Sequence, residues 1–311
     1  MREFDGTPRT AAWIVTGPTS GIGYRAALDL AEHGTVVLVG RSPHKLKKVA
    51  AEINARPRGH AVTVTGDFSD LASVRRAAAE IVALDLPIAG LLNNAGVSPM
   101  GPAHTAQGWD LAFTTNHLGP FVFTEALVPH LPDGANVVFV CSAVEDPKRT
   151  SATLAGYRGG RYISAEAGLR GEWRPGGSRR PGMDAYATSK QCNLATVLEF
   201  ARETPRLRFN AVEPGFNPGT GLGRDAGPVA RLALRCVAAP LAPFITYWNT
   251  PKRAARMITH VLTDSSDATG VYYDEKGRPM PGSDQVRDPA FDARVVRETR
   301  TLLADIAGRP A

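Results

Sequence analysis

The stretch AWIVTGPTSGIGYRAALDL, residues 12–30, joins a short β-branched apolar run to a glycine-rich turn and a helical pattern. In such a turn, Gly17 permits a tight bend, Gly21 lets the backbone approach a pyrophosphate, and Gly23 lets the helix pack closely on the strand. The amide groups and the dipole at the start of the helix attract anions. The pattern therefore predicts a dinucleotide site, although the spacing G-x-x-x-G-x-G alone also fits a plain strand-to-helix turn. The residues expected to bind the cofactor here are Gly17, Thr19, Ser20, Gly21, Ile22 and Gly23.

Short apolar runs alternate with longer stretches rich in Ala, Leu, Arg and Glu along the rest of the chain. Strands that alternate with helices form parallel sheets, and right-handed crossovers leave a doubly wound sheet as the expected topology. We therefore expect an α/β, Rossmann-type doubly wound parallel sheet of about seven strands with helices on both faces. The expected strands are Ala12–Thr16, Thr35–Val39, Ala61–Thr65, Ile88–Leu92, Asn136–Val140, Leu207–Val212 and Gly270–Tyr273. Ser42 as N-cap and Pro43 at the first helical position predict a helix that runs toward Asn54.

No repeat or linker divides the 311 residues, so a single domain over residues 1–311 is expected. Residues 143–185 interrupt the alternation, with eight Gly and eight Lys or Arg against five Asp or Glu, and with no helical or strand period. We expect them to form an active-site insertion, either a lid or a surface flap. Residues 222–250 are expected to cover the substrate pocket. Because Arg231 and Arg235 flank their apolar residues, contact with a membrane surface is an alternative, as is ordinary core packing.

The overall charge is mildly basic, since 36 Lys and Arg against 30 Asp and Glu give +6. No basic stripe with interleaved aromatic residues is present, so a small-molecule substrate is a better expected partner than nucleic acid. Three scattered cysteines argue against a disulfide framework and against a metal site, and they indicate a reducing compartment. Met1–Thr10 lacks the apolar core of a signal peptide, and no stretch is typical of a membrane span. A cytoplasmic protein is therefore expected.

The second expected strand is followed by Gly40 and Arg41, where NAD-binding folds place an acid for the ribose 2′-hydroxyl. A guanidinium suits a 2′-phosphate, which favours NADP(H) over NAD(H). The alternative for Arg41 is a solvated loop charge. Asp67, which follows the third strand, is expected either to accept a hydrogen bond from the adenine amino group or to form the first turn of the next helix.

Six motifs follow one another as they do in the short-chain dehydrogenase/reductase family, which the sequence resembles over about residues 10–275. They are TGPTSGIG at 16–23, NNAG at 93–96, Asn116, Ser142, YATSK at 186–190, and Pro214-Gly215 followed by Thr220. The resemblance implies four catalytic residues. Ser142 would orient the substrate oxygen, Tyr186 and Lys190 would handle the proton, and Asn116 would kink its helix and hold a water that relays protons to the lysine.

The same resemblance implies where the cofactor is bound beyond the glycine turn, Arg41 and Asp67. The residues concerned are Asn94, Ala95, Gly96, Tyr186, Lys190, Pro214, Gly215 and Thr220. Pro214 and Gly215 would begin a loop that lines the nicotinamide. The chain departs from the family pattern at Asn217, where an aliphatic residue is common, and its threonine stands one place later than usual.

Tyr186 and Lys190 are spaced i, i+4 on an expected helix and so share one face. A tyrosine pKa of about 10 is too high for a base at neutral pH, and a neighbouring ammonium favours the phenolate. We therefore expect Lys190 to lower the pKa of Tyr186. The tyrosine then serves as acid when a carbonyl is reduced and as base when an alcohol is oxidised.

The run KQCNL at 190–194, the insertion before Tyr186 and Gly270–Tyr273 are similar to the retinol dehydrogenase and light-dependent protochlorophyllide reductase branch. Its members handle bulky, apolar or conjugated substrates. The hypothesis is an NADP(H)-dependent oxidoreductase that acts on a carbonyl or secondary alcohol without a metal. Reduction of a carbon–carbon double bond and a non-catalytic NADP sensor or scaffold are the alternatives. Because family members pair through two long helices but insertion-bearing members are often monomers, a monomer, a homo-dimer and a homo-tetramer all stay open.

Overall fold

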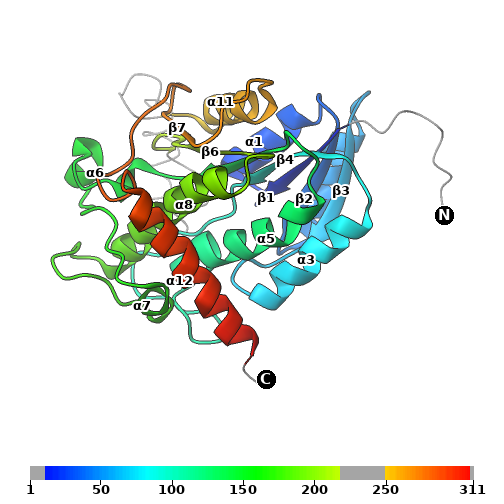
Figure 1. The fold of residues 1–311 in the computed structure, drawn as a ribbon. Helices are drawn as coiled ribbons and strands as arrows, with labels where there is room; N and C mark the ends of the chain where they lie inside the picture. Colours follow the sequence, from blue (N-terminus) through cyan, green and yellow to red (C-terminus); the bar gives the residue numbers. More distant parts are fainter. Residues whose placement is uncertain (1–10, 218–248, 309–311) are drawn as a thin grey trace, which may run out of the picture.

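A parallel sheet of seven strands forms the centre of the computed structural model, which describes residues 11–217 and 249–308 (Figure 1). The strands are β1 (Ala12–Thr16), β2 (Thr35–Gly40), β3 (His60–Thr65), β4 (Ile88–Asn93), β5 (Asn136–Val140), β6 (Arg208–Val212) and β7 (Val271–Tyr273). Their order is β3-β2-β1-β4-β5-β6-β7. Strands β2 and β3 are added on one side of β1, and strands β4 to β7 are added on its other side. The boundary between β1 and β4 is therefore the switch point at which doubly wound sheets bind ligands. The expected Rossmann-type fold is confirmed, and each expected strand agrees with the observed one to within one residue at either end.

Helices cover both faces of the sheet, each over its own apolar core (Figure 1). The longer helices are α1 (Gly21–Leu30), α2 (Pro43–Asn54), α3 (Leu71–Ala83), α5 (Gly119–Leu127), α8 (Pro181–Glu203), α11 (Pro251–Thr263) and α12 (Pro289–Ala307). Helices α1, α2 and α11 pack on one face, where Leu30 and Ile258 are fully buried. Helices α3, α5 and α8 pack on the other face, around Phe121 and Phe139. Helix α2 begins at Pro43, as expected.

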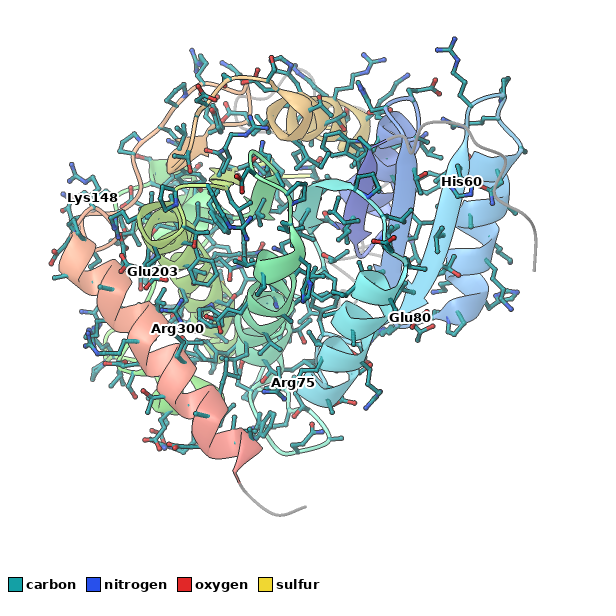
Figure 2. All side chains as sticks on the ribbon, turned by 45° about the vertical axis from the view of Figure 1, so that its right-hand side comes forward. His60, Arg75, Glu80, Lys148, Glu203 and Arg300 are labelled. Carbon is teal, nitrogen blue, oxygen red and sulfur yellow. The ribbon has the colours of Figure 1, made fainter. Side chains whose placement is uncertain are left out.

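Helix α12 lies across α8 and reaches α5 (Figure 1, red). Arg300 of α12 donates to Glu125 of α5 at 2.7 Å and to both carboxylate oxygens of Glu203, the last residue of α8. Figure 2 shows Arg300 and Glu203 on these adjoining helices. Arg202 of α8 donates to the buried carboxylate of Asp292 at 2.8 Å. These contacts fix α8 from its outer side.

Residues 143–185 are more regular and more buried than we expected. They contain η3 (Ala143–Glu145), α6 (Thr150–Leu154) and α7 (Ala165–Arg170), and they end in the first turn of α8. Tyr162 is 2% exposed, packs edge-on against Phe291 of α12, and donates to Glu298 at 2.8 Å. Contacts with α12 therefore order a segment that has no period of its own. Its role as a lid stays a prediction.

Some expectations concern residues outside the described ranges. These are Met1–Thr10, Thr220 and all but the last two residues of the segment 222–250. Within residues 11–217 and 249–308, no helix is both long enough and apolar enough to cross a bilayer.

Candidate active site

The glycine turn joins β1 to α1 at the switch point of the sheet. Gly17 has φ +67°, a left-handed conformation that favours glycine. A β-carbon at Gly23 would lie 2.3 Å from Nδ2 of Asn94, so only glycine fits there. Ser20 is the N-cap residue of α1, but its hydroxyl makes no capping hydrogen bond in the part of the chain that the structure describes. The first amides of α1 are therefore left for an anion.

The NNAG motif braces this turn from β4. The Nδ2 of Asn94 donates to the carbonyls of Thr16 at 2.9 Å and Gly17 at 3.3 Å. In return, the Thr16 hydroxyl accepts from the backbone amides of Asn94 and Ala95, both at 2.9 Å. Gly96 follows, with Oδ1 of Asn116 3.2 Å from where its β-carbon would be. The Nδ2 of Asn94 is thus engaged in shaping the turn, and contact of Asn94, Ala95 and Gly96 with the cofactor stays a prediction.

Arg41 and Asp67 follow β2 and β3, at the same edge of the sheet as the glycine turn. The side chain of Arg41 is exposed and forms no ion pair or hydrogen bond with residues 11–217 or 249–308. Asp67 instead has a local partner, because its Oδ1 accepts from the amide of Ser69 at 3.0 Å and from its hydroxyl at 2.7 Å. Arg41 is therefore available to a ligand. Asp67 forms a turn ahead of α3, whose N-cap is Asp70, so it does not lie in the first turn of that helix, and its contact with adenine stays a prediction.

Ser142, Tyr186 and Lys190 meet at the end of β5. Ser142 is extended and follows β5 by two residues, while Tyr186 and Lys190 project from α8. The side chain of Ser142 is near enough to that of Tyr186 to favour the phenolate and so to lower its pKa. The Nζ of Lys190 donates to the Val140 carbonyl at 2.7 Å and lies 5.7 Å from the centre of the Tyr186 ring. Three of the four predicted catalytic residues therefore lie together, and the ammonium of Lys190 faces the ring of Tyr186.

Burial is the dominant influence on the protonation of this group. It raises the pKa of Tyr186 above its usual range, and charge at Tyr157 or Glu213 acts in the same direction, while the nearby hydroxyl of Ser142 opposes it. Burial lowers the pKa of Lys190. Burial therefore acts against the lowering of the Tyr186 pKa that we expected from Lys190, and that effect of the lysine stays a prediction. Tyr186 consequently keeps its proton at neutral pH, in the form that can donate to a substrate oxygen.

Asn116 lies in a π-helical turn, η1 (Thr114–Leu118), and is fully buried. Its Oδ1 accepts from the amide of Val97 at 2.8 Å, and its Nδ2 donates to the Val97 carbonyl at 2.9 Å and the Ser189 hydroxyl at 3.0 Å. Its backbone carbonyl accepts from Nδ2 of Asn193 at 2.8 Å. The predicted helix irregularity is present, and Asn116 ties the loop after β4 to α8. Its role in a proton relay stays a prediction.

The loop after β6 carries Pro214 and Gly215 at the same edge of the sheet. Nδ2 of Asn217 donates to the Pro214 carbonyl at 3.0 Å and to the Gly215 carbonyl at 2.8 Å. Nδ2 of Asn249 also donates to the Pro214 carbonyl, at 3.1 Å. Asn217, where the chain departs from the family pattern, therefore closes this loop.

Our reading of the motifs did not identify Glu213, which follows β6 directly. Its carboxylate is buried and accepts hydrogen bonds from the backbone amides of Ala143 and Gly215. The sequence does contain a signal, namely an acidic residue directly after the apolar end of an expected buried strand. The ring of Tyr157, from the insertion, lies 6.3 Å from that of Tyr186. The insertion thus reaches the tyrosine that we predict to be catalytic.

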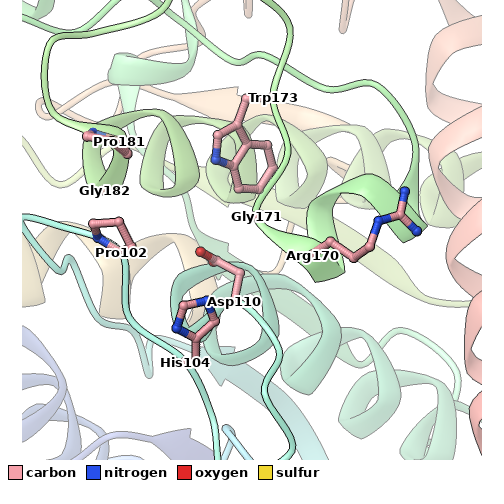
Figure 3. Close-up of a pocket in the computed structure, with 8 residues that line it drawn as sticks. All are labelled: Pro102, His104, Asp110, Arg170, Gly171, Trp173, Pro181 and Gly182. Atoms are coloured by element: carbon pink, nitrogen blue, oxygen red, sulfur yellow. The ribbon is translucent and has the colours of Figure 1, made fainter.

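A separate cavity of about 190 Å³ opens near the start of α8 (Figure 3). Figure 3 shows Trp173 of the insertion across from Asp110 and His104. Its lining residues are Pro102, His104, Asp110, Arg170, Gly171, Trp173, Pro181 and Gly182. Gly182 precedes Tyr186 by about 6 Å of helix rise. The insertion and the loop after β4 therefore form a hollow beside the first turn of α8, and Ser142, Tyr186 and Lys190 are not among the residues that line it.

Comparison with known proteins gives consistent matches. The family profile described as short chain dehydrogenase matches residues 11–158. The chain is 30% identical over 248 residues to the short-chain dehydrogenase/reductase pkfC of Emericella nidulans, covering 73% of this chain and 72% of the relative. It is 29% identical over 325 residues to the chloroplastic protochlorophyllide reductase B of Hordeum vulgare, covering 97% and 80%.

Solved structures share the fold. An uncharacterized protein from Mycobacterium paratuberculosis superposes with a TM-score of 0.69 at 25% identity, covering 94% of this chain and 93% of the other. A short-chain dehydrogenase from Burkholderia cenocepacia, crystallised with NADP, superposes with a TM-score of 0.63 at 22% identity, covering 87% and 98%.

Proposed function

This chain belongs to the short-chain dehydrogenase/reductase family, and from that premise we propose that it is an NADP(H)-dependent oxidoreductase acting on a carbonyl or a secondary alcohol. The observation that carries the proposal is the meeting of Ser142, at the end of β5, with Tyr186 and Lys190 of α8, where the buried Nζ of Lys190 lies 5.7 Å from the centre of the Tyr186 ring. Two hydroxyl groups side by side can both hydrogen-bond one substrate oxygen. A protein that only sensed the nucleotide would not need this group.

The residues present fit a dinucleotide phosphate. Gly17 and Gly23 let the turn pack against Asn94 and Ala95, where β-carbons would clash, and the uncapped first turn of α1 suits the pyrophosphate. The exposed guanidinium of Arg41 suits a 2′-phosphate, and the similar Burkholderia protein binds NADP. Pro214 and Gly215 would line the nicotinamide. When bound, this cofactor supplies or accepts the hydride.

The chain's own side chains handle the substrate oxygen and the proton. In reduction, the protonated Tyr186 donates its proton to the oxygen while Ser142 donates a hydrogen bond that holds it in place. Lys190, at 5.7 Å from the ring, favours the phenolate left behind. The side chain of Asn116 holds α8 and the loop after β4 together through hydrogen bonds with Ser189 and Val97. Oxidation of an alcohol runs through the same groups in reverse.

We further propose a bulky or apolar substrate. Tyr157 places an aromatic ring beside Tyr186, and Trp173 forms one wall of the neighbouring cavity. Both belong to the insertion 143–185, so this segment supplies apolar area next to the reacting group. Aromatic walls favour substrates with extended apolar or conjugated surfaces.

A carbon–carbon double-bond reductase is the second candidate, because relatives named protochlorophyllide reductase align over 97% of this chain. In that reaction, Tyr186 would protonate carbon instead of oxygen. The test is NADPH oxidation by the purified protein against a panel of small and bulky aldehydes and ketones, together with conjugated alkenes. Turnover of ketones with Ser142→Ala strongly impaired supports carbonyl reduction, turnover of alkenes alone supports the second candidate, and no turnover of either contradicts both.

A further inference from the structure

Glu213 is a buried acid that no expected role accounts for. It directly follows β6, and its side chain is 8% exposed. Its Oε2 accepts from the amide of Ala143, the residue after Ser142, and its Oε1 accepts from the amide of Gly215 at 3.0 Å. Its own backbone amide donates to the Tyr273 carbonyl of β7 at 2.8 Å. One side chain therefore joins the loops that follow β5 and β6.

These two loops carry different halves of the proposed site. The first begins at Ser142, and the second contains Pro214 and Gly215. A carboxylate can accept hydrogen bonds at both oxygens, whereas the amide of glutamine would turn a donor toward one of the two N–H groups. The length and charge of Glu213 thus match the task of holding the two loops together.

The charge of Glu213 also acts on the catalytic pair. Burial raises the pKa of Glu213, and the hydrogen bonds from Ala143 and Gly215 oppose that rise by favouring the carboxylate. Its negative charge raises the pKa of Lys190 against the effect of burial and adds to the rise at Tyr186. The other titratable groups that face this cluster are Cys141, Glu145, Arg149, Tyr272 and Glu275.

We propose that Glu213 is a positioning residue, which rests on the function proposed above: its carboxylate clamps the loop of Ser142 to the Pro214-Gly215 loop. The clamp sets the distance between the hydroxyl that orients the substrate and the loop beside the nicotinamide. Small displacements of such groups slow the chemical step more than they weaken substrate binding.

The first experimental arm needs no activity. Hydrogen–deuterium exchange of the protein without cofactor is compared among wild type, Glu213→Gln, Glu213→Ala and Glu275→Gln. Glu275 is another buried acid near this cluster, so its variant controls for loss of a charge. We expect faster exchange in peptides covering 141–146 and 213–217 in both Glu213 variants, and not in the control. Unchanged exchange in the Glu213 variants overturns the clamp. If the alanine variant fails to fold, the nearly isosteric glutamine variant decides.

The second arm uses NADPH-dependent turnover. Glu213→Gln is expected to lower kcat by roughly 10- to 100-fold with KM changed less than about threefold. Because loss of the negative charge lowers the pKa of both Tyr186 and Lys190, the alkaline limb of the pH–rate profile should move to lower pH. An unchanged kcat and profile, with wild type active, overturns the positioning role. If wild type turns over no substrate, the proposed function fails, while the exchange data still decide on the clamp.

Discussion

The Nζ of Lys190 lies 5.7 Å from the centre of the Tyr186 ring and donates to the carbonyl of Val140. Both side chains are buried, at 5% and 8% exposure. The ammonium is therefore fixed by the end of β5 and not by the phenol. In the mechanism that we propose, Tyr186 starts as a protonated acid, and Lys190 acts on the phenolate that forms after the proton has left.

Lys190→Ala removes both the fixed charge and the donor to Val140. We expect kcat to fall by about 10²-fold or more and NADPH affinity to fall by about tenfold. Steady-state kinetics and fluorescence titration measure the two effects. Lys148→Ala is the matched control, because that lysine is exposed and its ammonium pairs with Asp284 on the surface. Wild-type activity in Lys190→Ala would remove the lysine from the mechanism.

Arg41→Ala tests the choice of cofactor. A charge-assisted contact with a 2′-phosphate is worth about 1.5–3 kcal/mol, or about 10- to 100-fold in affinity. We expect wild type to bind NADPH more tightly than NADH, and the variant to lose most of that preference while NADH binding stays unchanged. Lys45→Ala serves as control, because Lys45 is also an exposed cation but lies on α2 and not in the loop after β2. Equal binding of both cofactors by wild type contradicts the assignment.

Tyr157→Ala tests whether the insertion sets specificity. Tyr162 anchors the insertion in the core, so deleting residues 150–178 would also remove packing, whereas Tyr157 can be truncated alone. We expect kcat/KM for bulky ketones to fall by roughly tenfold or more, and that for small aldehydes to change little. Leu154→Ala, at a residue 84% exposed on α6, is the control. An unchanged substrate profile would leave the insertion without a role in specificity.

Glu145→Gln tests how far a buried carboxyl group beside the site lowers the stability of the fold as pH rises. Burial raises the pKa of Glu145 to about 7, and its Oε2 has no hydrogen-bond partner among the described residues. Because the folded pKa lies above the unfolded value of about 4.3, wild-type stability falls as pH rises between these values. Relative to wild type, the Tm of the variant should therefore rise by at least roughly 2–4 °C between pH 5 and pH 8. Thermal unfolding measures this, with the exposed Glu166→Gln as control. A pH-independent difference would contradict the raised pKa.

The sequence predicts the sheet well because each strand is a short apolar run bounded by turn residues. Runs such as Thr35–Val39 are buried on both faces, so their composition alone distinguishes them from the amphipathic helices. The order of the strands follows from the handedness of crossovers. The structure of the insertion is harder to predict from the sequence, because Tyr162 is buried by α12, which lies more than a hundred residues later in the chain.

In the site, too, sequence motifs predict which residues lie together, whereas tertiary contacts decide their surroundings. The i, i+4 spacing of Tyr186 and Lys190 predicts their shared face but not their burial, nor the charge effects of Cys141, Tyr157 and Glu213 on them, because these depend on tertiary contacts. Sequence motifs do not identify Glu213, because its hydrogen-bond partners are the backbone amides of Ala143 and Gly215, which any residue type could supply. Asp67 has a local sequence signal, Ser69, that favours the turn it forms.

The most direct test of the central claim follows the hydride and the proton together. Wild type and Tyr186→Phe are incubated with a bulky ketone and NADPH deuterated at the hydride-donating carbon, and the product is analysed by mass spectrometry. We predict an alcohol with deuterium on the carbinol carbon, formed about 10²- to 10⁴-fold more slowly by the variant, with NADPH affinity nearly unchanged. Deuterium on no carbonyl carbon, or equal rates in the two proteins, would contradict the account.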